Sequence, residues 1–250
     1  MTISADVVDP PSWADQVKGL VRRRYTHLAE TDAFPPGGAV RAIAAGYPKD
    51  WLDDLPERVT GSYSGCGYAL EDVELSGVRV AVDLGCGAGL DALLVAGRLA
   101  SAAMVVALDL APSMLERVRE AAGSLAGTIV RPVAADMEQL PLADGTADLV
   151  LANASFNLAL DKHAAFAEAA RILRSGGCLV ARDLVRDGPL PTEIAQNSAA
   201  WNTSLGGVLD QDDLYEALRI AGFVDIRITG HTPFSVVAAV RIQALRAAVM

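Results

Sequence analysis

Three alternating glycines in the segment VDLGCGAGLD (residues 82–91) could bring backbone amides close to a ligand. Gly85, Gly87 and Gly89 directly follow an apolar run, so we expect them at a turn from a strand into a helix. The N-terminus of such a helix favours a negatively charged group. The spacing differs from the dinucleotide fingerprint G-x-G-x-x-G, because Leu90 stands where that pattern needs its third glycine. The segment predicts a nucleotide-type cofactor site, in which Asp83 either orients the loop and the cofactor's amino group or only binds backbone amides.

Two carboxylates follow the next two apolar runs. Asp109 lies near the end of MVVALDL (104–110), where it could accept hydrogen bonds from both ribose hydroxyls or only cap the next helix. Asp136 and Met137 follow the run that begins at residue 129, where they could read an adenine amine and cover the ring, or start a turn. Because both acids are predicted at one edge of a parallel sheet, we favour the cofactor interpretation. Further cofactor contacts are predicted at Tyr63, Cys86, Leu110, Met114 and Asn153.

The elements that must position these residues alternate regularly from residue 78. Apolar runs at 78–84, 104–110, 129–136, 147–153 and 178–185 are separated by helical segments at 90–99, 113–122 and 163–173. Runs that are apolar on both faces are typical of parallel strands covered by helices, so the fold class is a doubly wound α/β sheet. After a helix near 211–221 come the runs 223–229 and 234–242, joined only by GHTP. A link this short permits only antiparallel pairing.

The N-terminal part has a different organisation. Apolar positions at helical spacing predict a helix from Trp13 to Ala29, with Ser12 as its N-cap, and FPPGG (34–38) ends it. A short helix from about Ala39 and the acidic segment KDWLDDLPE follow. We expect residues 1–76 to form a helical cap and lid, and residues 77–250 to form the cofactor-binding domain, with an insertion around 187–210.

Composition excludes several classes of protein. The 250-residue chain has a net charge of −10 and no basic tract, which argues against a nucleic-acid partner. No apolar run approaches the roughly 20 residues that span a bilayer, so no membrane partner is expected. The N-terminus lacks the features of a signal peptide, and we expect a cytoplasmic protein. Three cysteines without zinc-ligand spacing disfavour a disulfide framework, and no bound metal is predicted. The oligomeric state is not determined.

The order of these motifs resembles the class I S-adenosylmethionine (SAM)-dependent methyltransferases. The D-x-G-x-G-x-G turn, Asp109, the Asp136–Met137 pair, ADLVLANAS (147–155) and RILRSGG (171–177) occur in sequence over roughly residues 70–245. The resemblance implies a Rossmann-like, seven-stranded sheet whose last strand is antiparallel. It also implies that the cofactor is SAM.

Most of the chain is similar to the arsenite methyltransferases. RRRYTHLA, GYPKDWLDDLPERV, YSGCGYAL and WNTSLGGVL run in that family's order. The resemblance implies a site of three thiolates, which here fall at Cys66, Ala154 and Ser204. Neither alanine nor serine can replace a soft thiolate as a ligand for a thiophilic centre. We interpret Cys86 and Cys178 as small core residues.

The scaffold therefore resembles that family, while the acceptor site looks rebuilt. Tyr63, Cys66, Asn153 and Asn157 are the candidate catalytic residues: Cys66 is expected to line the pocket without reacting, and the others to orient an acceptor or touch the cofactor. We predict a SAM-dependent methyltransferase that acts on a small organic molecule in specialised metabolism. One alternative is an arsenite methyltransferase that combines Cys66 with external thiols. Another is a SAM-binding protein without catalysis, and the glycine spacing disfavours a nicotinamide oxidoreductase.

Overall fold

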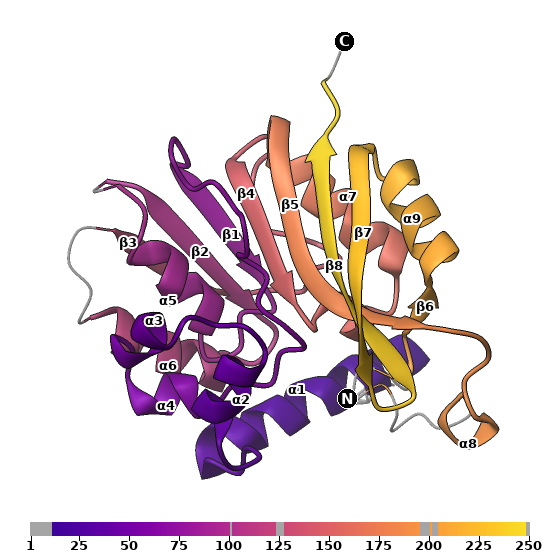
Figure 1. The fold of residues 1–250 in the computed structure, drawn as a ribbon, viewed down its shortest axis with the longest axis horizontal. Helices are drawn as coiled ribbons and strands as arrows, with labels where there is room; N and C mark the ends of the chain where they lie inside the picture. The colour runs from indigo at the N-terminus through magenta and orange to yellow at the C-terminus, as the bar shows by residue number, and fades with distance from the viewer. Residues whose placement is uncertain (1–11, 101, 124–127, 196–200, 202–204, 249–250) are drawn as a thin grey trace, which may run out of the picture.

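The structure is a computed structural model of the chain, and it describes residues 12–100, 102–123, 128–195, 201 and 205–248. Across these ranges, no helix is both long and apolar enough to cross a membrane. A central sheet runs through the middle of the molecule, with helices on both sides of it (Figure 1).

The sheet has the predicted doubly wound topology. Its strand order is β3-β2-β1-β4-β5-β8-β7, and the short strand β6 pairs with β5. The first five strands are parallel, and β8 is antiparallel to both of its neighbours. The strands are β1 (Val80–Leu84), β2 (Met104–Asp109), β3 (Ile129–Ala134), β4 (Ala147–Asn153), β5 (Leu173–Arg186), β6 (Leu209–Asp210), β7 (Phe223–Phe234) and β8 (Val237–Arg246). The seven-stranded sheet with a final antiparallel strand is confirmed, with β6 as an addition at its margin.

The hairpin at the end of the chain differs from the expectation in its turn. The segment GHTP was predicted as the link, but β7 continues through it to Phe234, and the chain turns at Ser235, whose φ is 58°. The register between β7 and β8 shifts between Thr229 and Thr232, which absorbs the irregular segment. Because β7 is an edge strand, Pro233 can lack an N–H there without breaking the ladder.

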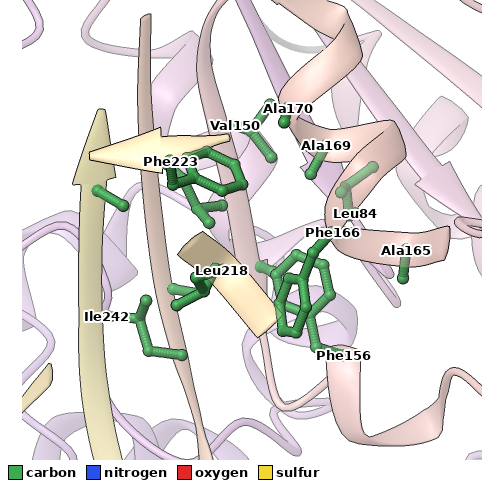
Figure 2. Packing of buried hydrophobic residues seen from close by; sticks show 14 of the residues in the cluster. Leu84, Val150, Phe156, Ala165, Phe166, Ala169, Ala170, Leu218, Phe223 and Ile242 are labelled. Atoms are coloured by element: carbon green, nitrogen blue, oxygen red, sulfur yellow. The ribbon is translucent and has the colours of Figure 1, made fainter. Parts of the chain in front are cut away.

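Two hydrophobic layers hold helices against the two faces of the sheet. On one face, α7 (Lys162–Ile172) and α9 (Gln211–Ile220) pack on the sheet, and Figure 2 shows Phe156 and Phe166 among the side chains at this contact. Their rings are 4.6 Å apart between centroids. On the other face lie α5 (Leu90–Ala96) and α6 (Pro112–Ala122), together with residues from the N-terminal part of the chain. The turn η1 (Phe156–Leu158) follows β4.

The N-terminal helices gather beside the sheet. They are α1 (Trp13–Thr31), α2 (Gly38–Ala44), α3 (Lys49–Asp53) and α4 (Glu57–Thr60), and α8 (Thr192–Ala195) lies in the expected insertion. The predicted N-cap is confirmed: Ser12 and Asp15 form a capping box at the start of α1. In Figure 1, α1 runs along the lower edge of the sheet. The carboxyl ends of β1, β2 and β4 meet near this edge, so α1 covers the place where the predicted cofactor residues converge.

Candidate active site

Two adjoining cavities lie between the cap and the carboxyl ends of the parallel strands. The first contains about 840 Å³ of empty space and the second about 490 Å³, in each case partly open to solvent. Five residues line both cavities: Tyr25, Ser64, Gly85, Gly87 and Asn153. The cavities are therefore two lobes of one site, and the cap and the core both contribute to their junction.

The glycine-rich turn forms the floor of this junction. Gly85, Gly87 and Gly89 have φ values of 72°, 53° and 89°, which residues other than glycine rarely adopt. A Cβ on Gly85 would lie 2.5 Å from the Cβ of Ser155, so a side chain has no room there. Gly89 lines neither cavity: it is the N-cap of α5, and a Cβ there would meet Val118 at 2.9 Å. Two of the glycines shape the cavity and the third packs α5 against α6.

Asp109 lies at the end of β2, beside the first lobe. Its carboxylate accepts hydrogen bonds from the backbone N–H groups of Gly87 (2.9 Å) and Ala111 (2.8 Å), so it joins the glycine turn to the start of α6. Burial raises the pKa of Asp109, and backbone hydrogen bonds oppose that rise. Asp109 is not the N-cap of α6, which is Ala111 without a side-chain cap, so these bonds hold the two loops together, and lone pairs remain on a carboxylate that lines the cavity. Leu110 lines the first lobe and Met114 the second.

Asp136 and Met137 lie after β3 and line the first lobe, as their predicted role requires. One oxygen of Asp136 accepts from the N–H of Glu138 at 2.9 Å. The other accepts from the ammonium group of Lys18 at 2.6 Å, a contact across 118 residues of sequence. Lys18 was not among the predicted site residues.

The second lobe contains two buried polar atoms that have no hydrogen-bond partner among the residues that the structure describes: Oδ2 of Asp83 and the hydroxyl of Tyr63. Burial, and then the nearby charge of Asp91, raise the pKa of Asp83 well above its usual range. An unpartnered buried carboxyl group is costly, and a ligand that brings a cation or a donor would remove that cost. These two buried oxygens therefore fit SAM, which carries an ammonium group and a sulfonium.

Asn153 lies at the junction of the lobes, but most of its hydrogen bonds are internal. Its side-chain nitrogen lies within hydrogen-bond distance of the hydroxyl of Tyr47 (2.9 Å), the carbonyl of Gly67 (2.9 Å) and the carboxylate of Asp91 (3.0 Å). Its side-chain oxygen accepts from the N–H of Cys66 at 3.0 Å. Asn153 thus joins the end of β4 to the cap while one side of it faces the cavity.

Asn157 lines neither lobe. Its side-chain nitrogen donates to Asp183 (2.8 Å) and to the carbonyl of Leu184 (2.7 Å), and its backbone N–H also donates to Asp183. Both donated bonds of this side chain stay inside the protein, so it is not directed at a methyl acceptor. Its geometry favours a role in holding the η1 turn against β5. Burial raises the pKa of Asp183 to about 6.

Cys66 lines neither lobe, contrary to the expectation that it lines the pocket, because it packs against an apolar cluster that includes Leu184, Val208 and Val237. Burial, and then the charge of Asp183, raise the pKa of its thiol well above the usual range. Ala154, at the position of the second implied thiol, lines the first lobe with a methyl group and has a φ of 55°. Ser204, at the third, is outside the described residues. Cys86 lines the second lobe, and Cys178 lines neither.

Helix α1, part of the predicted cap, forms a roof over the first lobe with residues that were not among the predicted site residues. Four residues of α1 line it, and their positions differ by three, four and seven: Lys18, Val21, Arg22 and Tyr25. Residues at this spacing lie on one face of a helix. The sequence therefore showed that these residues share a face, but not that the face covers the cavity. Phe34, which follows α1, lines the second lobe.

Comparisons with known proteins agree with this architecture. The family described as "Methyltransferase domain" matches residues 76–222. The arsenite methyltransferase of Halobacterium salinarum is 29% identical over 230 residues, which cover 86% of this chain and 59% of that protein. The malonyl-[acyl-carrier protein] O-methyltransferase of Geobacter sulfurreducens is 37% identical over 155 residues, covering 59% of this chain and 56% of that protein. The chain thus spans less than two thirds of the length of these curated relatives.

A solved structure shows the same fold. The arsenic(III) S-adenosylmethionine methyltransferase of Chlamydomonas reinhardtii superposes with a TM-score of 0.64 at 24% identity, covering 86% of this chain and 75% of that one. The family match extends over more than half of the chain, and it includes the glycine turn, Asp109, Asp136 and Asn153. The chain therefore belongs to the methyltransferase-domain family and has the class I fold of SAM-dependent methyltransferases.

Proposed function

We propose that this protein transfers a methyl group from SAM to a small organic acceptor. The observation that carries the choice of acceptor is the chemistry around Cys66. One buried thiol, a methyl group at Ala154 and an apolar cluster stand where a site for arsenite would need several thiolates. The raised pKa of the Cys66 thiol keeps it protonated at neutral pH, and a protonated thiol is a poor ligand.

The cofactor would lie across both lobes. We assign the adenosine part to the first lobe, where Asp136 would read the adenine amine, Met137 and Leu110 would cover the ring, and Asp109 would bind the ribose. We assign the amino-acid part to the second lobe, where the free oxygen of Asp83 and the hydroxyl of Tyr63 can accept from or donate to it. Bound SAM supplies a methyl group that is electrophilic because it is attached to a sulfonium.

The chain's own contribution would be positioning and exclusion of water. Tyr25 and Ser64 of the cap and Asn153 of the core line both lobes, so these three residues surround the place where the lobes meet. A nucleophile held close to the methyl group and in line with the bond that breaks gains most of its rate from proximity and desolvation. Buried aliphatic and aromatic walls favour an acceptor with an apolar body.

A second candidate is methylation of arsenite with the help of external thiols. Its support is the similarity to arsenite methyltransferases over 86% of the chain and the presence of Cys66 at the first of the three implied thiol positions. Relatives named malonyl-[acyl-carrier protein] O-methyltransferases favour the organic alternative instead, because their name gives an organic acceptor that is methylated on oxygen. A third candidate, binding of SAM without catalysis, predicts affinity for the cofactor and no transfer.

The test uses the full chain and SAM labelled in its methyl group. Transfer is measured to arsenite in excess glutathione and, in parallel, to a panel of carboxylic acids, phenols and amines with apolar bodies. Transfer to an organic acceptor together with negligible methylation of arsenite supports the proposal. Robust turnover of arsenite contradicts it, and tight binding of SAM without transfer to any acceptor favours the non-catalytic alternative.

A further inference from the structure

Lys18 and Arg22 are the two charged residues among the four of α1 that line the first lobe, and Lys18 contacts acids of the opposite wall. Its ammonium group lies 2.6 Å from Oδ2 of Asp136 and 2.5 Å from Oε2 of Glu138. The three side chains are 26%, 32% and 13% exposed, so the cluster is half-buried at the mouth of the cavity. Burial lowers the pKa of Lys18, but the bonds and charges of the two acids raise it more, so the lysine remains charged.

The acids that Lys18 contacts are themselves fixed to the walls of the lobe. Oδ1 of Asp136 accepts from the N–H of Glu138, and Oε1 of Glu138 accepts from the N–H of Leu160 at 2.7 Å. Glu138 therefore connects the loop after β3 with the segment before α7. Through Lys18, α1 is tied to both of these walls at once.

The other end of α1 is held in a different way. Arg117 of α6 is buried, and its guanidinium group donates to the carbonyl of Ala29 and to Asp32 at the end of α1. The side chain of Arg117 is 2% exposed, although its partner Asp32 is exposed, whereas all three side chains of the Lys18 cluster are partly accessible to water and to salt. The roof over the first lobe thus has two ionic attachments, one through the buried guanidinium of Arg117 and one through the partly exposed ammonium of Lys18, and the second touches the carboxylate that faces the cavity.

We propose that Lys18 is a positioning residue of the cofactor site: its ammonium group fixes the carboxylate of Asp136 for the adenine amine and holds α1 closed over the adenosine part. This inference depends on the proposed function, in which Asp136 reads that amine. A carboxylate has about four lone-pair directions, and the two contacts to Asp136 leave room for a further donor. Lys18 therefore orients the carboxylate of Asp136 without using all of its capacity to accept hydrogen bonds.

The test compares Lys18→Met and Lys18→Gln with Lys18→Arg, which keeps the charge. Lys49→Met is the matched control, because Lys49 forms an exposed ion pair with Asp53 far from the lobe. Binding of S-adenosylhomocysteine and of its deaminated analogue, in which a carbonyl replaces the adenine amine, is measured by calorimetry at low and high salt. Unfolding by urea without ligand shows whether the variants keep their fold.

We expect both uncharged variants to bind S-adenosylhomocysteine about fivefold more weakly, the scale of a partly exposed pair of charges. They should lose much less affinity for the deaminated analogue, and high salt should weaken the wild type more than the variants. Lys18→Arg should restore most of the affinity, and Lys49→Met should behave as the wild type.

Unchanged binding in the uncharged variants would overturn the inference, since Lys18 would then contribute nothing to the site, and tighter binding would overturn it because Lys18 would compete with the cofactor for Asp136. Equal losses for both ligands would overturn the role of Lys18 in fixing Asp136, because holding α1 closed makes no distinction at the amine. Asp109→Ala, measured in parallel, separates a failure of the inference about Lys18 from a failure of the proposed cofactor site. If Asp109→Ala weakens binding and the Lys18 variants do not, only this inference fails; if none of them changes binding, the proposed cofactor site fails.

Discussion

The side-chain oxygen of Asn153 accepts a hydrogen bond from the backbone N–H of Cys66 at 3.0 Å. This single bond joins the carboxyl end of β4 to the glycine-rich loop of the cap. Gly65, the neighbour of Cys66, must be a glycine here, because a Cβ would lie 2.6 Å from the same oxygen of Asn153. The residue that the sequence assigned to the cofactor is thus also a link between cap and core.

We predict that Asn153→Ala lowers the free energy of unfolding by about 1–3 kcal/mol, because it leaves the Cys66 N–H and the Gly67 carbonyl without their partner. Urea denaturation followed by circular dichroism measures this change. Tyr47→Phe, which removes one hydroxyl of the same network, should cost less. A change within about 0.5 kcal/mol, typical of a surface substitution, would contradict the prediction.

Asp109 offers a test of the cofactor site itself. Asp109→Ala should weaken binding of S-adenosylhomocysteine by about 1–3 kcal/mol, because the ribose hydroxyls would lose their acceptor. The substitution also removes the acceptor for Gly87 and Ala111, so unfolding without ligand has to be measured alongside. Asp144→Ala, on the surface, is the control. Unchanged affinity by calorimetry would refute the ribose role.

Cys66→Ser distinguishes the two kinds of acceptor. If the acceptor is organic, turnover should be largely retained, because Cys66 lines neither lobe. The variant places a hydroxyl in the apolar cluster, so a small loss of stability is expected and is measured separately. Complete loss of turnover in a folded variant would restore the thiolate interpretation.

Asp183 predicts a pH dependence of stability. Its pKa is raised to about 6 by burial, above the value near 4 of an unfolded aspartate. The folded state therefore binds more protons than the unfolded state between about pH 4 and pH 6, so the stability from this group is present below pH 4 and is lost as the pH rises through 6. Asp183→Asn should remove that part of the slope. Identical slopes in urea titrations of the two proteins from pH 4 to pH 7 would contradict this assignment.

The sheet could be predicted from the sequence because its signals are local. Strands buried on both faces read as continuous apolar runs, and alternation with helices leaves few topologies. The same logic placed Asp109 and Asp136 at one edge, since parallel strands end together. The turn of the last hairpin could not be predicted, because an edge strand with a shifted register tolerates Gly230 and Pro233, which otherwise indicate a loop.

The cap and its residue Tyr63 were predicted for the site, but the contribution of α1 was outside the reach of sequence patterns. In the sequence, nothing distinguishes Lys18 from the other charged residues of a surface helix. Its partner Asp136 is 118 residues away, so no local pattern connects the two. For Asn157 the sequence suggested a functional contact where the structure shows an internal one. Its place in a family motif suggested contact with a methyl acceptor, but both hydrogen bonds that its side chain donates stay inside the protein. Residues that satisfy buried groups and residues that meet ligands have the same types, and only the three-dimensional arrangement separates them.

Arg117 provides the last prediction, because its guanidinium group is the buried anchor of the cap. Its side chain is 2% exposed, and it donates to Ser62 at 3.0 Å as well as to Ala29 and Asp32. Replacing it by methionine keeps much of the apolar stem but leaves these acceptors in the protein without a donor.

Arg117→Met should lower the free energy of unfolding by about 1.5–3 kcal/mol, the scale of hydrogen bonds to charged groups. It should also weaken binding of S-adenosylhomocysteine, because the end of α1 would no longer be fixed beside the lobes. Arg119→Met, on the exposed side of α6, is the matched control and should change neither quantity. If Arg117→Met behaves like this control in both urea denaturation and calorimetry, the cap is held by its apolar contacts alone, and the anchor assigned to Arg117 is wrong.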